Sequence, residues 1–223
     1  MIRRSLATLS LVLTIVAPLS AQKKHDADKK QHGGSLPAGW AGRTDKPNTK
    51  LADAKFVTMG TGYHVTSGPA AIYWAEKDKV KGAFVASASF QQTKAPEHPE
   101  AYGMFFQGNK MNGANVSYAY FLVRGDGKFM VNHRASAVPD VVHKIVDWTD
   151  NAAINKQDAK GVVTNVLGID ATKPDSVRLK VNGKQVHALS VAYLGSLAGN
   201  VGLRVNHNLD VHIADVSVTP SKK

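Results

Sequence analysis

Apolar and polar residues alternate along the stretch Asn200–Val218, with the period of two that is typical of strands with one buried face. Two alternating runs flank a polar tip at Asn206–Asn208. A three-residue loop at this tip predicts a hairpin in which the apolar side chains of both runs share one face and Arg204 lies opposite Asp210 on the other. The apolar phase then slips by one residue, which predicts a β-bulge near residues 214–215.

The segment Val177–Val191 carries the clearest turn signal in the chain. Asn182 and Gly183 are the preferred pair for a type I′ turn, because both central residues of that turn need positive φ. A two-residue loop here predicts a hairpin with one largely apolar face and with Arg178 opposite His187 on the other face. Six apolar side chains in the two hairpins are predicted to be buried: Val177, Leu179, Val181, Leu203, Val205 and Val211.

Short apolar runs alternate with turn signals along the chain from Phe56 onward, and no segment shows a sustained helical period. The further candidate strands are residues 63–66, 70–75, 83–90, 102–107, 116–123, 129–133 and 162–169. The stretch 136–160 is the least patterned, and we expect a long loop there or a short helix at 152–158. Many short strands with almost no helix predict an all-β fold, either a two-sheet antiparallel β-sandwich or a barrel.

The N-terminal residues 1–21 have the features of a signal peptide. Arg3 and Arg4 form a basic start, Leu6–Val16 an apolar core, and Ala21 a small residue at the cleavage point. The apolar run is shorter than the roughly 20 residues that span a bilayer. We therefore expect a periplasmic or secreted protein with no membrane span in the mature chain.

The rest of the chain divides into two parts. Residues 22–49 are predicted to be a disordered leader followed by a turn-rich linker, which Trp40 anchors to the domain. Residues 50–220 are predicted to form a single β-sandwich domain. The chain has no cysteine, so its stability must come from the core rather than from disulfides.

The formal net charge is +11 at pH 7, but much of it lies in the terminal segments. The segments before residue 35 and the two C-terminal lysines hold a net six of these charges, which leaves +5 on the predicted domain. The basic residues of the domain are scattered rather than clustered, whereas binding along a phosphate backbone needs a basic track. Nucleic acid is therefore not an expected partner.

Three C-terminal segments occur in an order that resembles a known superfamily. A strand with the turn VNGKQV (181–186) is followed by GNVGLRVN (199–206) and then by DVHIADVSV (210–218). This order is similar to the C-terminal half of concanavalin A-like jelly rolls, including secreted bacterial domains similar to keto-disaccharide hydrolases. The resemblance covers most of residues 50–220, and it implies a jelly-roll β-sandwich that binds or acts on saccharides.

Carboxylates are scarce where that resemblance would place a catalytic site. Glucanases of the superfamily carry Glu, Asp and Glu at alternate positions of one strand, which brings two carboxylates within the roughly 5 Å that retaining hydrolysis needs. This chain has only Glu76, Glu97 and Glu100, and no such run. A pair could still be assembled across strands, for example Glu100 with an aspartate. Glu97 and Glu100 are flanked by prolines, as is typical of a solvated loop.

Polar residues gather around the predicted C-terminal hairpin, and the candidate ligand-binding residues there are Arg204, His207, Asn208, Asp210 and His212. A metal site on Asp210 and His212 would need a third ligand, so we predict no metal and no cofactor. The two remaining interpretations are a saccharide-facing surface and a structural ion pair between Arg204 and Asp210.

Aromatic residues form a second candidate surface. Tyr118 and Tyr120 share one face of their predicted strand, and Arg124 lies at its end. Tyrosine rings can stack on sugars, although they pack equally well against neighbouring strands. We predict a saccharide-binding sandwich whose partner is a saccharide or a cell-surface glycan. The alternatives are a glycoside-cleaving enzyme and a purely structural exported domain.

Overall fold

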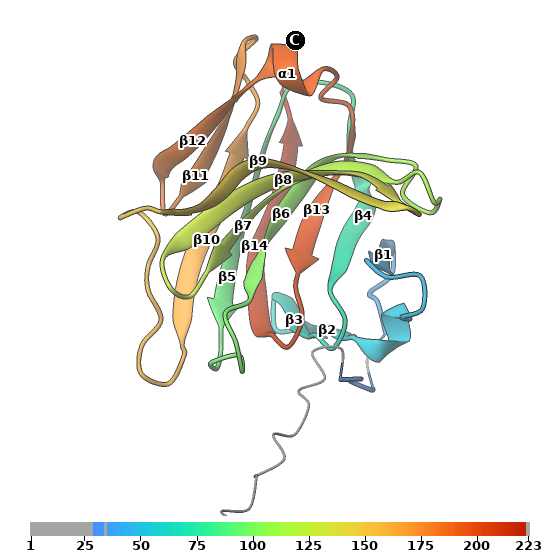
Figure 1. The fold of residues 1–223 in the computed structure, drawn as a ribbon, viewed down its shortest axis with the longest axis vertical. Helices are drawn as coiled ribbons and strands as arrows, with labels where there is room; N and C mark the ends of the chain where they lie inside the picture. The colour runs from blue at the N-terminus through green and yellow to red at the C-terminus, as the bar shows by residue number, and fades with distance from the viewer. Residues whose placement is uncertain (1–28, 34, 222–223) are drawn as a thin grey trace, which may run out of the picture.

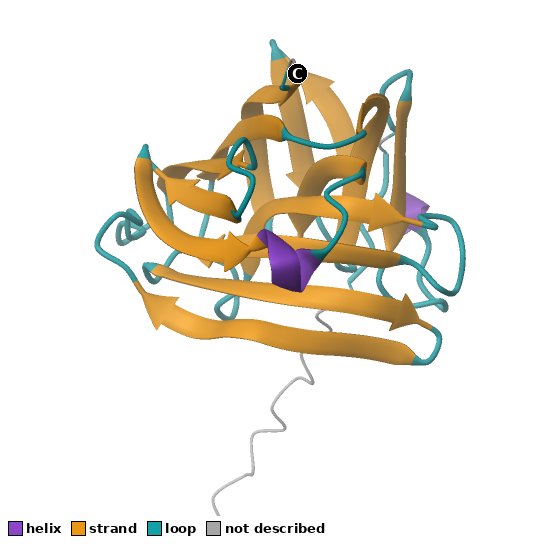
Figure 2. Ribbon diagram, turned by 90° about the horizontal axis from the view of Figure 1, so that it is seen from above, coloured by secondary structure: helices purple, strands orange, loops and turns teal. Residues whose placement is uncertain are grey.

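The computed structural model describes residues 29–33 and 35–221. It consists of two antiparallel sheets of seven strands each, joined by turns and loops (Figures 1 and 2). The only helical segments in the described residues are a 3₁₀ turn, η1 (Leu51–Asp53), and one short helix, α1 (Val191–Leu194). No helix in this part of the chain is long and apolar enough to cross a membrane. The predicted all-β sandwich is confirmed, whereas the predicted signal peptide lies outside the described residues.

The first sheet, sheet A, is formed from edge to edge by β1 (Trp40–Thr44), β4 (Ala71–Val80), β13 (Gly199–Val205), β6 (Ala101–Asn109), β7 (Ser117–Arg124), β8 (Lys128–Ala137) and β9 (Asp140–Asp150). Sheet B is formed by β12 (Lys184–Ser190), β11 (Ser176–Val181), β10 (Val163–Asp170), β5 (Phe84–Gln92), β14 (Asp210–Pro220), β3 (Gly62–Thr66) and β2 (Lys55–Met59). Each of the further candidate strands predicted from the sequence overlaps one of these elements.

The main core lies between the two sheets, because alternate side chains of each strand point into this space. All six side chains predicted to be buried belong to it: Val177, Leu179, Val181, Leu203, Val205 and Val211. Large aromatic side chains from both sheets fill the same space, including Tyr73, Phe90, Tyr102 and Phe121. The period-two pattern therefore identified the buried face correctly.

The predicted hairpin between residues 200 and 218 does not form. Strand β13 lies in sheet A and β14 in sheet B, so the tip at 206–208 connects the two layers rather than two paired strands. The Ser67 hydroxyl donates a hydrogen bond of 2.5 Å to the carbonyl of Asn206 and accepts one of 3.0 Å from the backbone N–H of Leu209. Two runs that face one core from opposite sheets show the same alternation as a hairpin, which is why the pattern did not distinguish them.

Two local features predicted for the C-terminal segments, the β-bulge and the type I′ turn, are present in the structure. The register between β14 and β5 shifts between Ala214 and Ser217, and this confirms the predicted bulge. Asn182 and Gly183 both have positive φ, +51° and +79°, as a type I′ turn requires. A second bulge in β12 then slips the register, so that Arg178 lies opposite Ala188 rather than the predicted His187.

Two segments that the sequence left without regular structure are strands. Residues 140–150 form β9, in the stretch predicted as loop or helix, and residues 152–158 form a turn followed by irregular structure instead of a helix. The predicted linker contributes β1, which pairs with β4 at one edge of sheet A. Trp40 packs on the main core, as predicted, although it does so as the first residue of a strand.

Candidate functional site

The outer face of sheet A, which points away from sheet B, carries a second apolar cluster. Its side chains come from β4, β6, β7 and β8 and from the loop between β6 and β7: Ile72, Trp74, Ala101, Phe105, Met111, Val116, Tyr118, Tyr120, Leu122 and Ala137. In Figure 1 the ribbon of β8 and β9 crosses in front of β6, β13 and β4. The N–H of Ala137 donates to the carbonyl of Ala114, which ties the end of β8 to that loop. Every side chain of this cluster is at most 7% exposed, and Met130 of β8 and Trp148 of β9 pack against it, so the chain itself covers this part of the outer face.

Arg204 lies at the centre of this face, on β13, and its side chain is held on several sides. Its guanidinium donates two hydrogen bonds to the carboxylate of Asp45, at 2.8 and 2.6 Å, and one of 3.1 Å to the hydroxyl of Tyr118. The guanidinium carbon also lies 4.6 Å from the centre of the Tyr120 ring, a cation–π contact. Only 4% of Arg204 is exposed to solvent.

A second arginine approaches the same carboxylate. Arg134 lies 3.3 Å from Asp45 and 2.5 Å from Asp140. Burial alone would raise the pKa of Asp45, but the charge and hydrogen bonds of Arg204, with the charges of Arg134 and His207, hold it at about 2. Asp45 is therefore ionised between two arginines, and we call Arg204, Asp45 and Arg134 the buried charge cluster.

The structure thus brings three of the predicted site residues together, Arg204, Tyr118 and Tyr120, but mainly in contact with the chain itself. The partner of Arg204 is Asp45, not the predicted Asp210. Burial raises the pKa of Tyr118 to about 12, so its hydroxyl stays protonated and donates or accepts hydrogen bonds only. No sequence signal pointed to Asp45, which lies in the predicted linker.

Arg124 ends β7 at the edge of the same face, away from the charge cluster. It binds Asp126 through two hydrogen bonds, at 3.2 and 2.5 Å. Its guanidinium carbon lies 4.2 Å from the centre of the Trp148 ring. The arginine is therefore held between a carboxylate and an aromatic ring, in a position separate from that of Arg204.

The other predicted residues lie on β14 or on the connection before it. His207 and Asn208 belong to the turn between the two sheets, where Asn208 has a positive φ of +50°. Asp210 and His212 lie on the outer face of sheet B, because their neighbours Val211 and Ile213 point into the core. The predicted common surface of Arg204, Asp210 and His212 is therefore wrong, since the two sheets separate them.

Asp210 has partners of its own on sheet B. Its carboxylate lies 2.9 Å from His64 and 3.2 Å from Lys94, and it accepts a hydrogen bond of 2.5 Å from Thr93. Burial would raise the pKa of Asp210, but the hydrogen bonds of Thr93 and Lys94 and the charges of Lys94 and His64 lower it. Among the described residues, no group of three or more His, Cys, Asp or Glu side chains is placed to hold a metal ion.

An open cavity of about 410 Å³ lies at the edge of the sandwich, where β1 of sheet A and β2 of sheet B end their sheets. We call it the edge cavity. It is lined by the segment before β1, the β2–β3 turn and the outer part of β4: Pro37, Ala38, Gly39, Trp40, Thr58, Gly60, Thr61, Gly62, Tyr63, Ala75, Glu76 and Lys77. The sequence analysis missed this site, because its walls come from three segments that lie apart in the chain.

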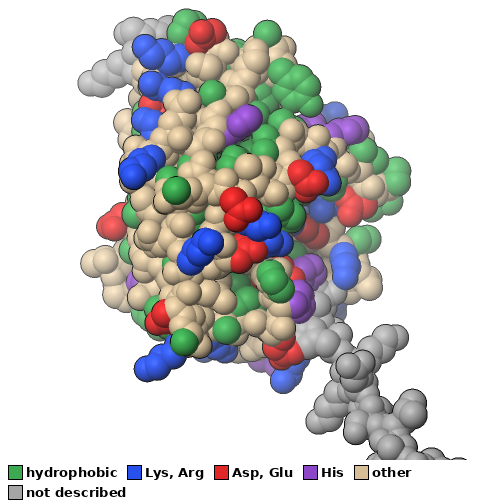
Figure 3. Space-filling view, turned by 60° about the vertical axis from the view of Figure 1, so that its left-hand side comes forward, with side chains coloured by type: hydrophobic (Ala, Val, Ile, Leu, Met, Phe, Trp, Pro, Cys, Tyr) green, Lys and Arg blue, Asp and Glu red, His purple; other side chains and the backbone are tan. Residues whose placement is uncertain are grey.

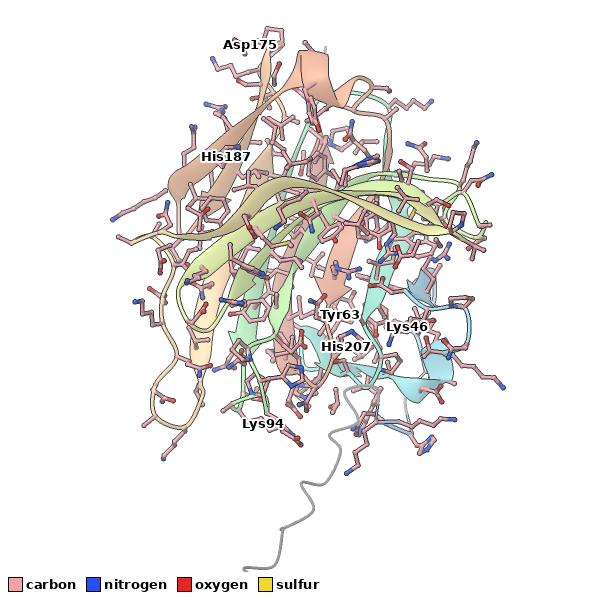
Figure 4. All side chains as sticks on the ribbon, viewed as in Figure 1. Lys46, Tyr63, Lys94, Asp175, His187 and His207 are labelled. Atoms are coloured by element: carbon pink, nitrogen blue, oxygen red, sulfur yellow. The ribbon has the colours of Figure 1, made fainter. Side chains whose placement is uncertain are left out.

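The walls of the edge cavity combine aromatic rings with a fixed carboxylate. The ring of Trp40 meets the ring of Tyr63 edge to face, with their centres 4.7 Å apart; Tyr63 is labelled in Figure 4. The indole N–H of Trp74 donates a hydrogen bond of 2.7 Å to Glu76, so the second apolar cluster orients this carboxylate. The cavity therefore offers rings for stacking, hydroxyls of Thr58 and Thr61, and one oriented carboxylate.

Carboxylates of two other elements meet in a smaller cavity of about 170 Å³. Glu97 and Glu100 reach it from the β5–β6 loop, and Asp126 reaches it from the β7–β8 turn. The sequence analysis left open a carboxylate pair of Glu100 with an aspartate, and Glu100 and Asp126 do line the same cavity. On the side facing the viewer in Figure 3, acidic and basic side chains lie next to each other near the centre, and several basic side chains lie at the upper left.

Comparison with solved structures decides the fold. The Bacteroides ovatus mixed linkage glucan PUL GH16 with its G4G4G3G product aligns with a TM-score of 0.54 at 10% identity, over 80% of this chain and 94% of that one. The fold is a concanavalin A-like jelly roll. A GH16 endo-glucanase from Bacteroides ovatus (TM-score 0.51, 11% identity, 87% and 98% covered) and a Bacillus licheniformis β-glucanase (0.50, 11%, 86% and 100%) agree. No protein-family model and no curated protein matches the sequence.

Strands β6 and β7, which lie in the interior of sheet A, present no alternating carboxylates on its outer face. The side chains that β7 presents there are Tyr118, Tyr120, Leu122 and Arg124, and β6 presents Ala101, Gly103 and Phe105. Asp45, which contacts Arg204 on this face, is bound by two arginines. These two strands therefore do not supply the carboxylate pair that retaining hydrolysis needs.

Proposed function

We propose that this protein is a non-catalytic saccharide-binding domain and that its binding site is the edge cavity. The observation that carries the proposal is the combination of Trp40, Tyr63 and the oriented Glu76 in one open cavity of about 410 Å³. Sugar rings present apolar C–H faces that pack on aromatic rings, and their hydroxyls donate to carboxylates. The jelly-roll fold, shared with glucan-bound structures, supports a saccharide ligand.

The charges in the edge cavity favour binding over cleavage. Glu76 is the only carboxylate among its lining residues, and glycoside hydrolysis by either stereochemical route uses two. Lys77 provides a donor next to that acceptor, so the cavity can pair with sugar hydroxyls of either polarity. A neutral saccharide has no charge of its own that must lose its water when it binds to these groups.

The Glu76→Gln variant tests this site. We expect it to weaken saccharide binding roughly 10-fold or more, because a charged acceptor contributes more than a neutral one. The variant keeps an acceptor for the Trp74 indole, so the free energy of unfolding should change by less than about 0.5 kcal/mol. A glycan array identifies the ligand of the wild type, and titration calorimetry compares the variants.

The matched control is Asp150→Asn, which removes an exposed carboxylate on β9, far along sheet A from β1 and β4. Equal binding by the wild type and Glu76→Gln would contradict the edge cavity as the site. Release of reducing ends from the bound glycan would contradict the non-catalytic proposal and favour the glycoside-cleaving alternative.

We also propose that the protein is exported. The basic start, the apolar core and Ala21 in the first 21 residues support cleavage by a signal peptidase. Mass spectrometry of the protein from the extracytoplasmic fraction should then show Gln22 as the first residue. Recovery of intact Met1 in the membrane fraction would contradict this expectation.

A further inference from the structure

The smaller cavity lies at the end of the sandwich where three connections meet. The β5–β6 loop (93–100), the β7–β8 turn (125–127) and the long β9–β10 connection (151–162) gather there, at the lower left of Figure 1. Its lining residues are Gln92, Pro96, Glu97, His98, Pro99, Glu100, Gly125, Asp126 and Gln157. We call it the acceptor pocket.

Backbone hydrogen bonds lock the three connections to one another. The N–H of Gln157 donates to the carbonyl of Gly125 at 2.8 Å, and the N–H of Ala95 donates to the carbonyl of Lys160 at 3.2 Å. Gly161 lies so close to Ala95 that a β-carbon at this glycine would overlap the Ala95 backbone. Hydrogen bonds and close packing therefore hold the walls of the pocket in place.

A buried amide in the pocket has an acceptor without a partner. The Gln92 side-chain NH₂ donates to Oε1 of Gln157 at 2.7 Å and to the carbonyl of Gly161 at 2.6 Å. Both partners are acceptors, so they fix which end of the amide is nitrogen. The remaining atom, Oε1 of Gln92, has no hydrogen-bond partner although the residue is 0% exposed. Buried polar atoms of this kind normally have one.

Carboxylates surround the same space. Glu100 is only 11% exposed in its side chain, and its Oε1 lies 2.7 Å from Nε2 of His98. Asp126 is held in place by Arg124, and Glu97 adds a third carboxylate to the lining. The pocket thus gathers three carboxylates, of which Asp126 is paired with Arg124 and Glu100 with His98.

We infer that the acceptor pocket binds a primary ammonium group. Carboxylates and an amide oxygen only accept hydrogen bonds, so the complementary group is a cation with several donors, and an ammonium has three. The volume of about 170 Å³ admits a small ligand or the end of a larger one. Amino sugars and simple diamines both carry this group. The inference does not depend on the edge cavity, which has different walls.

Titration calorimetry of the mature wild-type protein at neutral pH and low salt tests the inference, with glucosamine, N-acetylglucosamine and putrescine as probes. We expect glucosamine or putrescine to bind and N-acetylglucosamine not to bind, because acetylation removes the positive charge. Binding of glucosamine alone identifies an amino sugar as the source of the ammonium, and binding of putrescine identifies a diamine. Failure of both amines to bind, or equal binding of N-acetylglucosamine, would overturn the inference.

Variants locate the bound amine. Glu100→Gln and, separately, Asp126→Asn should weaken its binding roughly 10- to 100-fold, since each removes one charged acceptor. Glu76→Gln in the edge cavity should leave amine binding unchanged. If Glu76→Gln abolishes amine binding while Glu100→Gln and Asp126→Asn do not, the amine binds in the edge cavity and the acceptor pocket is not its site. Thermal unfolding of each variant confirms that a loss of binding is not a loss of fold.

Discussion

Replacing Asp45 by alanine should lower the free energy of unfolding by about 3–5 kcal/mol, the range for removing one partner of a buried ion pair. The carboxylate neutralises Arg204 and Arg134, which are each 4% exposed. Without Asp45, Arg204 would be a buried charge paired only with the Tyr118 hydroxyl and the Tyr120 ring. Chemical denaturation of the wild type and the variant measures the difference.

The control for this prediction is Asp140→Ala. Asp140 also binds Arg134, at 2.5 Å, but it lies at the exposed end of the β8–β9 hairpin. Exposed ion pairs contribute about 0–1 kcal/mol, so this variant should lose far less stability than Asp45→Ala. If Asp45→Ala loses no more stability than Asp140→Ala, the prediction that Asp45 is the main counter-charge of the buried charge cluster is contradicted.

Stability should fall at acid pH, because the pKa of Asp45 is lower in the folded protein than in the unfolded chain. The folded value of about 2 lies below the unfolded value of 3.8, so ionised Asp45 stabilises the fold fully above about pH 4. This contribution, about 2 kcal/mol, is lost as the pH falls from about 4 to about 2. The Asp45→Asn variant should lack that part of the acid sensitivity. Parallel pH profiles for the two proteins would contradict the assignment.

The strands and the turn at Asn182 and Gly183 could be predicted because the information is local. Alternation predicts which side chains face a core. An Asn-Gly pair predicts a type I′ turn, because both residues tolerate the positive φ that this turn needs. The bulge after Ile213 was predictable for the same reason, since it shifts the phase within one strand.

The layer to which each strand belongs is not local information. The Val201–Val205 and Leu209–Ile213 runs bury the same residues whether they form a hairpin or face each other from opposite sheets. The partner of Arg204 was hidden for a similar reason, because Asp45 lies 159 residues away in the sequence. The walls of the edge cavity likewise come from separate segments, and pairing between distant strands creates them.

Leu203→Ala should lower the free energy of unfolding by about 2–5 kcal/mol, the second large effect expected in this protein. Leu203 is 0% exposed on β13, in the middle of sheet A, and its side chain belongs to the core between the sheets. Truncation removes buried apolar surface and leaves a cavity that two hydrogen-bonded sheets cannot easily close. The matched control is Val166→Ala on β10, where the valine is 44% exposed and the change should stay within about 0.5 kcal/mol. Denaturant titration of both variants measures the effect, and a loss below about 0.5 kcal/mol for Leu203→Ala would contradict the assigned core.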